Sequence, residues 1–251
     1  MVCTAFVRAD YFFMRQKTQA IVLHLTPHSD SMSVLNLYTR DFGRIDYAVY
    51  GLSGKKGKMR RAMFEPLSLL EIDVNHQPTQ QLQRLDDVRL LSVNHQIALD
   101  IKKRTICMFI AEILYRVLRH PMTDEQLFDF LMLSVETLEY TAEPKNFHLS
   151  FLLRLTQFIG CYPNFDISGQ WFDLRSGEKT PTIPLHPDFL NADEIGVIEQ
   201  IAQSEDLTAA DVELSRQQRA KALQNMLAYY SLHVANMPEL KSLEVLTAIF
   251  D

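Results

Sequence analysis

Several kinds of residue and segment are scarce in this chain of 251 residues. It contains three cysteines, Cys3, Cys107 and Cys161, and their wide, unpaired spacing excludes a disulfide framework and a cysteine-based zinc site. No stretch approaches the ~18–20 apolar residues that cross a membrane. The N-terminus lacks the charged start, sustained apolar run and small-residue cleavage site of a signal peptide. We therefore expect a protein with reduced thiols that stays in the cytoplasm.

Catalytic motifs are missing as well. The chain has no HExxH, paired CxxC or histidine cluster for a catalytic metal, and no GxSxG turn for a nucleophilic serine. The carboxylate pairs Asp86–Asp87 and Asp124–Glu125 are typical of a turn and of a helix N-terminus. The sequence thus predicts no catalytic residue, metal or cofactor. A nuclease that uses Asp86 and Asp87 remains as the enzyme alternative, and it requires metal-dependent cleavage.

Two periodicities divide the chain. Between residues 18 and 91, short segments with alternating apolar residues are separated by turn residues, which predicts five strands in a small barrel. An oligonucleotide-binding (OB) barrel is one such solution, and an SH3-like barrel fits the pattern almost as well. From about residue 97 the apolar period becomes 3.6 residues, which predicts helices at 97–120, 124–140, 146–160, 192–203, 215–237 and 242–250. Thr123 is the expected N-cap of the second helix, and Gly160 the expected C-cap of the third.

Charge is distributed unevenly along the chain. Acidic residues outnumber basic ones by 31 to 25, a net charge of −6. Residues 40–61 nevertheless hold seven cations against two acids, a balance of +5, which leaves about −11 on the remainder. Such segregation is typical of a polyanion site, because phosphate contacts dominate nucleic-acid affinity. The predicted DNA-binding residues lie on strand ends and on a flexible glycine-containing loop: Arg40, Arg44, Lys55, Lys56, Lys58, Arg60 and Arg61.

Other interpretations of this loop were weighed. A solvated loop whose lysines only keep the protein soluble is the simplest one. A nucleotide-binding P-loop is excluded, because Gly51 and Gly57 are separated by five residues instead of four and Met59 replaces the metal-binding hydroxyl. Aromatic residues interleave with the arginines at Tyr38, Phe42, Tyr47 and Tyr50, where exposed rings would stack on bases. Alternation does not determine which of these rings face the core.

Cations also border apolar stripes of the predicted helices. A groove of this kind suits an acidic peptide with apolar residues. The candidate partner-binding residues are Lys102, Lys103, Arg104, Arg116 and Arg119. Ordinary solvated helix edges would give the same pattern.

The first barrel segment, KTQAIVLHLTPHSDSMSVLNLYTRDFGRIDYAVYGLSGKKGKMRRAMFEPLSLLEIDV, resembles the N-terminal domain of RecO, the bacterial recombination mediator of the RecF pathway. The matching features are a T-x-x-I-V-L strand, a threonine and a glycine at the second turn, and a glycine before a basic loop, followed by an apolar-proline-leucine entry to the fourth strand: Thr39, Gly43, Gly51, Phe64, Pro66 and Leu67. Near the C-terminus, LAYYSLHVANMPELKSLEVL is similar to the closing segment of the family.

The resemblance implies an α+β protein, with a five-stranded OB-fold at 14–92 and an α-helical domain at 93–251 that has an irregular insertion at about 161–187. Residues 1–13 would be an extension. It also implies binding and annealing of single- and double-stranded DNA, contact with the acidic tail of single-stranded-DNA-binding protein (SSB), and loading of RecA together with RecR. A protein-interaction adaptor without direct DNA binding is the alternative.

Many members of that family carry a four-cysteine zinc module after the third helix. Here the corresponding stretch contains only Cys161, so we expect no zinc. The aromatic residues Phe165, Trp171 and Phe172 are expected to hold the insertion together instead.

Overall fold

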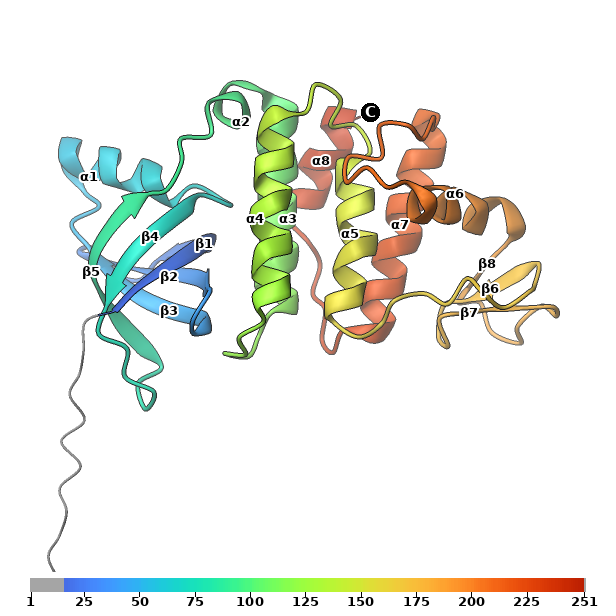
Figure 1. Cartoon of the computed structure of the whole chain (residues 1–251), viewed down its shortest axis with the longest axis horizontal. Helices are drawn as coiled ribbons and strands as arrows, with labels where there is room; N and C mark the ends of the chain where they lie inside the picture. The colour runs from blue at the N-terminus through green and yellow to red at the C-terminus, as the bar shows by residue number, and fades with distance from the viewer. Residues whose placement is uncertain (1–15, 251) are drawn as a thin grey trace, which may run out of the picture.

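The computed structural model describes residues 16–250, so the extension expected at 1–13 lies outside the described residues. A β-barrel forms one end of the molecule, helices form its middle, and a small β-sheet lies at the other end (Figure 1). This arrangement confirms the predicted α+β class.

Five strands form a closed barrel in the order β1-β2-β3-β5-β4. All neighbouring pairs are antiparallel except β3 and β5. A short helix α1 and a 3-10 turn η1 connect β3 to β4, which makes this the OB-type solution and not the SH3-like one. The elements are β1 (Gln16–Pro27), β2 (Met32–Thr39), β3 (Gly43–Tyr50), α1 (Gly54–Arg61), η1 (Ala62–Phe64), β4 (Leu69–Val74) and β5 (Leu82–Leu90).

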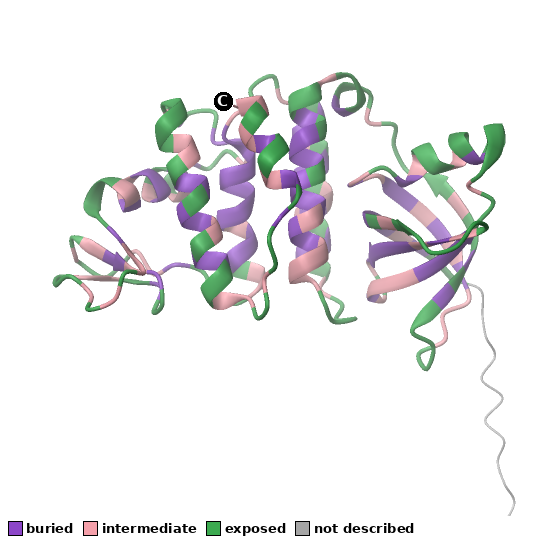
Figure 2. Cartoon of the chain, turned by 180° about the vertical axis from the view of Figure 1, so that it is seen from behind, coloured by how far each residue is buried: buried purple, intermediate pink, exposed green. Residues whose placement is uncertain are grey.

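The two faces of strand β1 enter different cores. Ala20 and Val22 point into the barrel interior, where they pack with residues of the other strands. Ile21 and Leu23 point outward and join the core of the helical region. Strand β1 therefore alternates between two buried faces, and one hydrophobic core extends from the barrel wall into the helices. Figure 2 shows buried residues on both the strands and the central helices.

Seven helices follow the barrel: α2 (His95–Leu99), α3 (Ile101–Val117), α4 (Glu125–Tyr140), α5 (Phe147–Phe158), α6 (Ala192–Gln203), α7 (Arg216–His233) and α8 (Ser242–Phe250). The stretch predicted as one helix from residue 97 is two, because Asp100 adopts an extended conformation and caps α3 through Lys102 N and Lys103 N. The N-cap of α4 is Asp124, whose side chain accepts from Leu127 N, and not Thr123. Gly160, with φ of +75°, follows the C-cap residue of α5.

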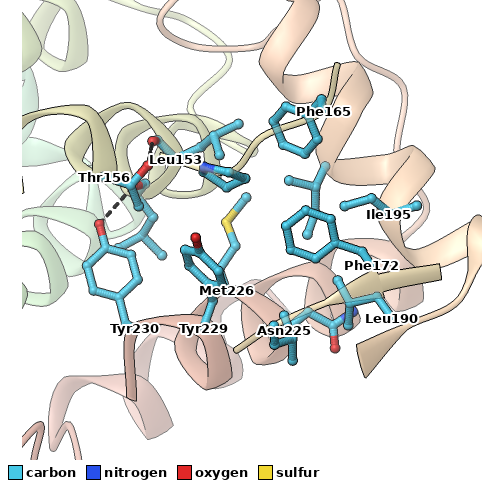
Figure 3. A pocket seen from close by; sticks show the side chains of 14 residues that line it. Leu153, Thr156, Phe165, Phe172, Leu190, Ile195, Asn225, Met226, Tyr229 and Tyr230 are labelled. Atoms are coloured by element: carbon cyan, nitrogen blue, oxygen red, sulfur yellow. Dashed lines mark hydrogen bonds between the residues drawn. The ribbon is translucent and has the colours of Figure 1, made fainter. Parts of the chain in front are cut away.

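The insertion folds as a three-stranded sheet of β6 (Trp171–Asp173), β7 (Glu178–Thr180) and β8 (Phe189–Leu190). Phe172 is 2% exposed and lies between the rings of Phe165 and Tyr229, at centroid distances of 6.0 and 6.2 Å. Tyr229 of α7 donates a hydrogen bond of 2.9 Å to the carbonyl of Cys161. Apolar side chains from this sheet, α5, α6 and α7 surround a remaining space of only about 20 Å³ (Figure 3). Packing on α7 thus fixes the insertion.

Candidate nucleic-acid interface

The basic segment predicted as a flexible loop is helix α1. Its residues lack an apolar stripe, so intrinsic amphipathicity does not explain why it forms. Gly51 and Gly54, with φ of +73° and +72°, make the turn that leads into the helix. Arg60 donates a hydrogen bond of 3.1 Å to the carbonyl of Tyr50 and so ties the helix back to the end of β3. These contacts order the segment.

Gly57 is the one buried residue of α1. A Cβ atom at this position would lie 2.4 Å from the carbonyl carbon of Leu52 and 2.9 Å from the carbonyl oxygen of Gly51. The helix therefore packs directly on backbone, at a distance that only glycine allows. This close approach packs α1 onto the segment that connects it to β3.

The cations of α1 face solvent. Lys55, Lys56, Lys58 and Arg61 are exposed and Arg60 is half-buried. The helix has no acidic residue in its first turn, and within residues 16–250 none of its five cations forms an ion pair. Three of the cations lie in the last turn, where they complement the helix dipole. The result is a compact, uncompensated positive surface.

Several charged side chains on the neighbouring strands lie in ion pairs. Glu71 of β4 pairs with Arg89 of β5 at 2.6 Å and lies 4.0 Å from Lys17 of β1. Arg84 pairs with Asp86 at 3.6 Å. In contrast to these paired charges, the five cations of α1 have no ion-pair partner within residues 16–250.

Only one of the four aromatic candidates is freely exposed. Tyr50, beside α1, is 54% exposed, whereas Tyr47 is fully buried inside the barrel. Burial raises the pKa of Tyr47 well above the usual tyrosine value. Tyr38 is covered by α4, where its ring stacks on Phe128, and burial raises its pKa to about 12. Phe42 is half-buried and stacks on His76 at 4.2 Å.

Two of the seven predicted DNA-binding residues join the barrel to the helices instead. Arg40 pairs with Asp129 of α4 and lies over the ring of Phe128 at 4.6 Å. Arg44 donates through Nη1 to the carbonyls of Tyr115 and Leu118, both at 2.9 Å, at the C-terminal end of α3. The structure therefore separates Arg40 and Arg44 from the α1 surface, because they bridge the two regions.

The predicted partner-binding residues do not form one surface. Lys102 and Arg104 are exposed, but Lys103 is only 5% exposed. Its Nζ atom donates a hydrogen bond of 2.6 Å to the carbonyl of Glu139. Arg116 lies 3.8 Å from Glu112 of the same helix, and Arg119 donates to the carbonyl of Asn236. Lys103 thus has a structural position that the charge pattern did not reveal.

Two classes of site have no counterpart among residues 16–250. No group of three His, Cys, Asp or Glu side chains could hold a metal ion there. Within the same range, no helix combines the length and apolar character needed to span a membrane. Asp86 and Asp87, the candidates for a nuclease, face Arg84 and the amide of Val88 instead of a common centre.

Sequence reasoning missed two features of this region. It did not identify Gly57 as a packing residue, because a glycine within a basic run is also typical of a loop. It did not predict the contact between His24 and Tyr115, whose rings lie 5.1 Å apart across the junction of barrel and helices. No local signal connects residues so distant in the chain.

Comparisons with known proteins agree with this architecture. The family model described as recombination protein O N terminal matches residues 14–94, and recombination protein O C terminal matches residues 98–244. The DNA repair protein RecO of Bacteroides fragilis is 35% identical, over 95% of this chain and 100% of the relative. That of Phocaeicola vulgatus is 34% identical, over 94% and 100%. The chain therefore belongs to the RecO family of non-enzymatic DNA repair and recombination mediators.

Proposed function

We propose that helix α1 binds the phosphate backbone of DNA and that the protein uses this contact to anneal strands and to help load RecA onto SSB-coated DNA. The observation that carries the proposal is the set of five cations on α1 without a carboxylate partner in the described chain. Cations that neutralise phosphates release counterions, which favours binding of any sequence. A mediator that acts wherever DNA is damaged requires such sequence independence.

Tyr50 supplies the second element of the proposed contact. Its exposed ring lies at the end of β3, and Arg60 of α1 donates to its carbonyl. A ring in this position stacks on an unpaired base while the neighbouring cations contact the flanking phosphates. Stacking of this kind adds about 1–3 kcal/mol per base. It favours single strands, since bases in a duplex are not available.

Neutralisation of four exposed cations tests this proposal. We expect the variant with Lys55, Lys56, Lys58 and Arg61 replaced by Gln to bind oligothymidine much more weakly, with a salt slope reduced by about 3, since each single-strand phosphate contact contributes about 0.7. The matched control replaces Lys102, Arg104, Arg175 and Lys221, which also removes four positive charges. Unchanged affinity and salt slope in the α1 variant would exclude α1 as the site. Absence of salt-dependent binding in the wild type would favour the adaptor without DNA binding.

A hollow between α5, α7 and α8 supports the proposed contact with the acidic SSB tail. Leu223, Leu246 and Phe250 line it together with Arg216 and Arg219, around an open space of about 100 Å³. Arg219 also donates to Asn146 Oδ1 and to the carbonyl of Leu214. Apolar walls with cations beside them suit an acidic peptide that contains apolar residues. This location differs from the helix edges predicted from the sequence. Support for RecR as a partner comes from family membership alone.

The peptide contact can be measured directly. We expect a fluorescent peptide with the sequence of the SSB tail to bind the wild-type protein and to lose affinity several-fold in Arg216→Gln. Lys221→Gln, on the same helix, serves as the control. Equal affinity for both variants would argue against this hollow.

A further inference from the structure

A second group of basic side chains lies at the junction between the barrel and the helices, apart from α1. Its members come from β1, β3, α3 and the segment before α8: His24, Arg44, Arg116 and Lys241. We refer to them as the junction cluster. Three of them surround the ring of Tyr115, which lies 5.1 Å from the His24 ring, 4.5 Å from the Arg44 guanidinium and 5.3 Å from that of Arg116. Lys241 is linked to the group through Glu112, which accepts from its backbone N–H and approaches Arg116.

The junction cluster has little negative charge to balance it. Glu112 is the one carboxylate that contributes to the electrostatic environment of His24, against Arg116, Arg44 and Lys241. Its oxygens already accept from Lys241 N at 3.2 Å and from Ser242 N and Oγ at 2.9 and 2.7 Å. Glu112 is therefore engaged in holding the start of α8 and only approaches Arg116, at 3.8 Å.

Arg116 has an unused hydrogen-bond donor. Its Nε atom is buried and has no partner in the described structure, although the side chain as a whole is 30% exposed. A buried guanidinium donor without an acceptor is unfavourable. Partial burial, together with the charges of Arg116, Arg44 and Lys241, also lowers the pKa of His24. A phosphate oxygen placed beside Arg116 would accept from Nε and lie close to the positive charges of Arg44 and Lys241.

The chemistry of the junction cluster favours a nucleic-acid strand. His24 and Lys241 are exposed, and the Tyr115 ring lies between the cations, so that a phosphate and an adjacent base can be contacted together. An acidic peptide with apolar residues would instead require apolar walls, which the hollow at α7 and α8 provides. Arg44 contributes charge only through its remaining atoms, because Nη1 is engaged with the end of α3.

We propose that the junction cluster is a second phosphodiester-binding site, which holds one nucleic-acid strand while α1 holds another. The inference rests on the proposed role of α1. Helix α1 lies on the side of the barrel away from the helices, whereas the cluster lies where barrel and helices meet (Figure 1). Two separate sites on one chain would bring two strands together, which favours the proposed annealing.

The proposal is tested by energy transfer between two oligonucleotides that cannot pair with each other. One is oligothymidine with a donor dye and the other is oligocytidine with an acceptor dye, each of about 10 nucleotides. We expect energy transfer on the wild-type protein and a calorimetric stoichiometry of two oligonucleotides per chain. Lys241→Glu and the double variant Arg116→Gln, Lys241→Gln should lose the energy transfer and bind one oligonucleotide, with about tenfold or greater loss at the second site. The Lys241 side chain is exposed, and in residues 16–250 it forms no hydrogen bond or ion pair, so we expect Lys241→Glu to stay folded. Lys221→Gln with Arg175→Gln controls for net charge.

The α1 variant separates the two proposals. If the α1 variant keeps one oligonucleotide and this is lost when Lys241→Glu is added, both sites are supported. If the α1 variant binds none, the junction cluster is not an independent site, while the proposed role of α1 stands. If the junction variants retain two oligonucleotides and energy transfer, the inference is overturned. An acidic peptide that loses affinity in Lys241→Glu, with oligonucleotide binding unchanged, would overturn it in favour of a protein partner.

Discussion

The substitution Gly57→Ala tests whether the position of α1, and not only its charge, determines DNA binding. In most helix interiors, replacement of glycine by alanine stabilises by about 0.5–1 kcal/mol, because alanine loses less conformational freedom. At position 57 the added Cβ would lie 2.4 Å from the Leu52 carbonyl carbon and 2.7 Å from its oxygen. Both are backbone atoms, so no side chain can rotate away.

The cost of such overpacking is about 1–3 kcal/mol, which exceeds the gain in helix propensity. The helix must therefore move away from residues 51 and 52, and the hydrogen bond from Arg60 to the Tyr50 carbonyl is strained or lost. The net charge remains −6. We expect reduced amide protection in residues 50–62 and a several-fold loss of single-strand affinity, with the protein still folded.

Gly196→Ala is the matched control. Gly196 lies within α6, and no atom lies within 4 Å of the position that its Cβ would take. This variant should be stabilised by about 0.5–1 kcal/mol and should bind DNA as the wild type does. The reasoning is refuted if Gly57→Ala shows the same hydrogen exchange, stability and oligonucleotide affinity as Gly196→Ala.

Two further predictions concern stability. His148 is 1% exposed, and burial together with the charge of Arg219 lowers its pKa from 6.5 to about 3. As the pH falls, His148 is protonated in the unfolded chain near pH 6.5 but stays neutral in the folded protein until about pH 3. The free energy of unfolding is therefore highest above pH 6.5 and decreases as the pH falls towards 3, by about 2 kcal/mol at pH 5. Urea unfolding at pH 7 and pH 5 should show a smaller loss in His148→Phe, and an equal loss would contradict the assignment. Phe172→Ala should lower the free energy of unfolding by about 3–5 kcal/mol, because a buried ring is removed. Addition of a chelator to the wild-type protein should leave its melting temperature unchanged. A chelator-induced drop in that temperature would mean that a metal holds the insertion.

The barrel and most helices were predictable because their periodicity has a direct physical cause. A strand with one buried face alternates, and a helix with one buried face repeats every 3.6 residues. Helix α1 was not predictable in this way, since its order comes from backbone packing at Gly57 and not from an apolar stripe. The same limit explains why the sequence predicted a flexible loop for the segment with the candidate DNA-binding residues.

Long-range partners were the other limit. Arg40 belongs to the basic segment by position, but it meets Asp129, which lies 89 residues further along the chain. Lys103 belongs to a run of three cations, yet its ammonium group reaches the carbonyl of Glu139 inside the helical region. Composition gives the sum of charges, and only the fold decides which of them remain available to a ligand.

The shared core at strand β1 has a consequence for how the chain unfolds. Removal of the helices would expose Ile21, Leu23 and Tyr38, which are at most 2% exposed in the whole chain. Each such side chain contributes about 1.5–3 kcal/mol when buried, and a whole domain is stable by only about 5–15 kcal/mol. An isolated barrel would therefore be only marginally stable and prone to aggregation. The two family models meet between residues 94 and 98. Because the core continues across this boundary, we expect the two regions to unfold together.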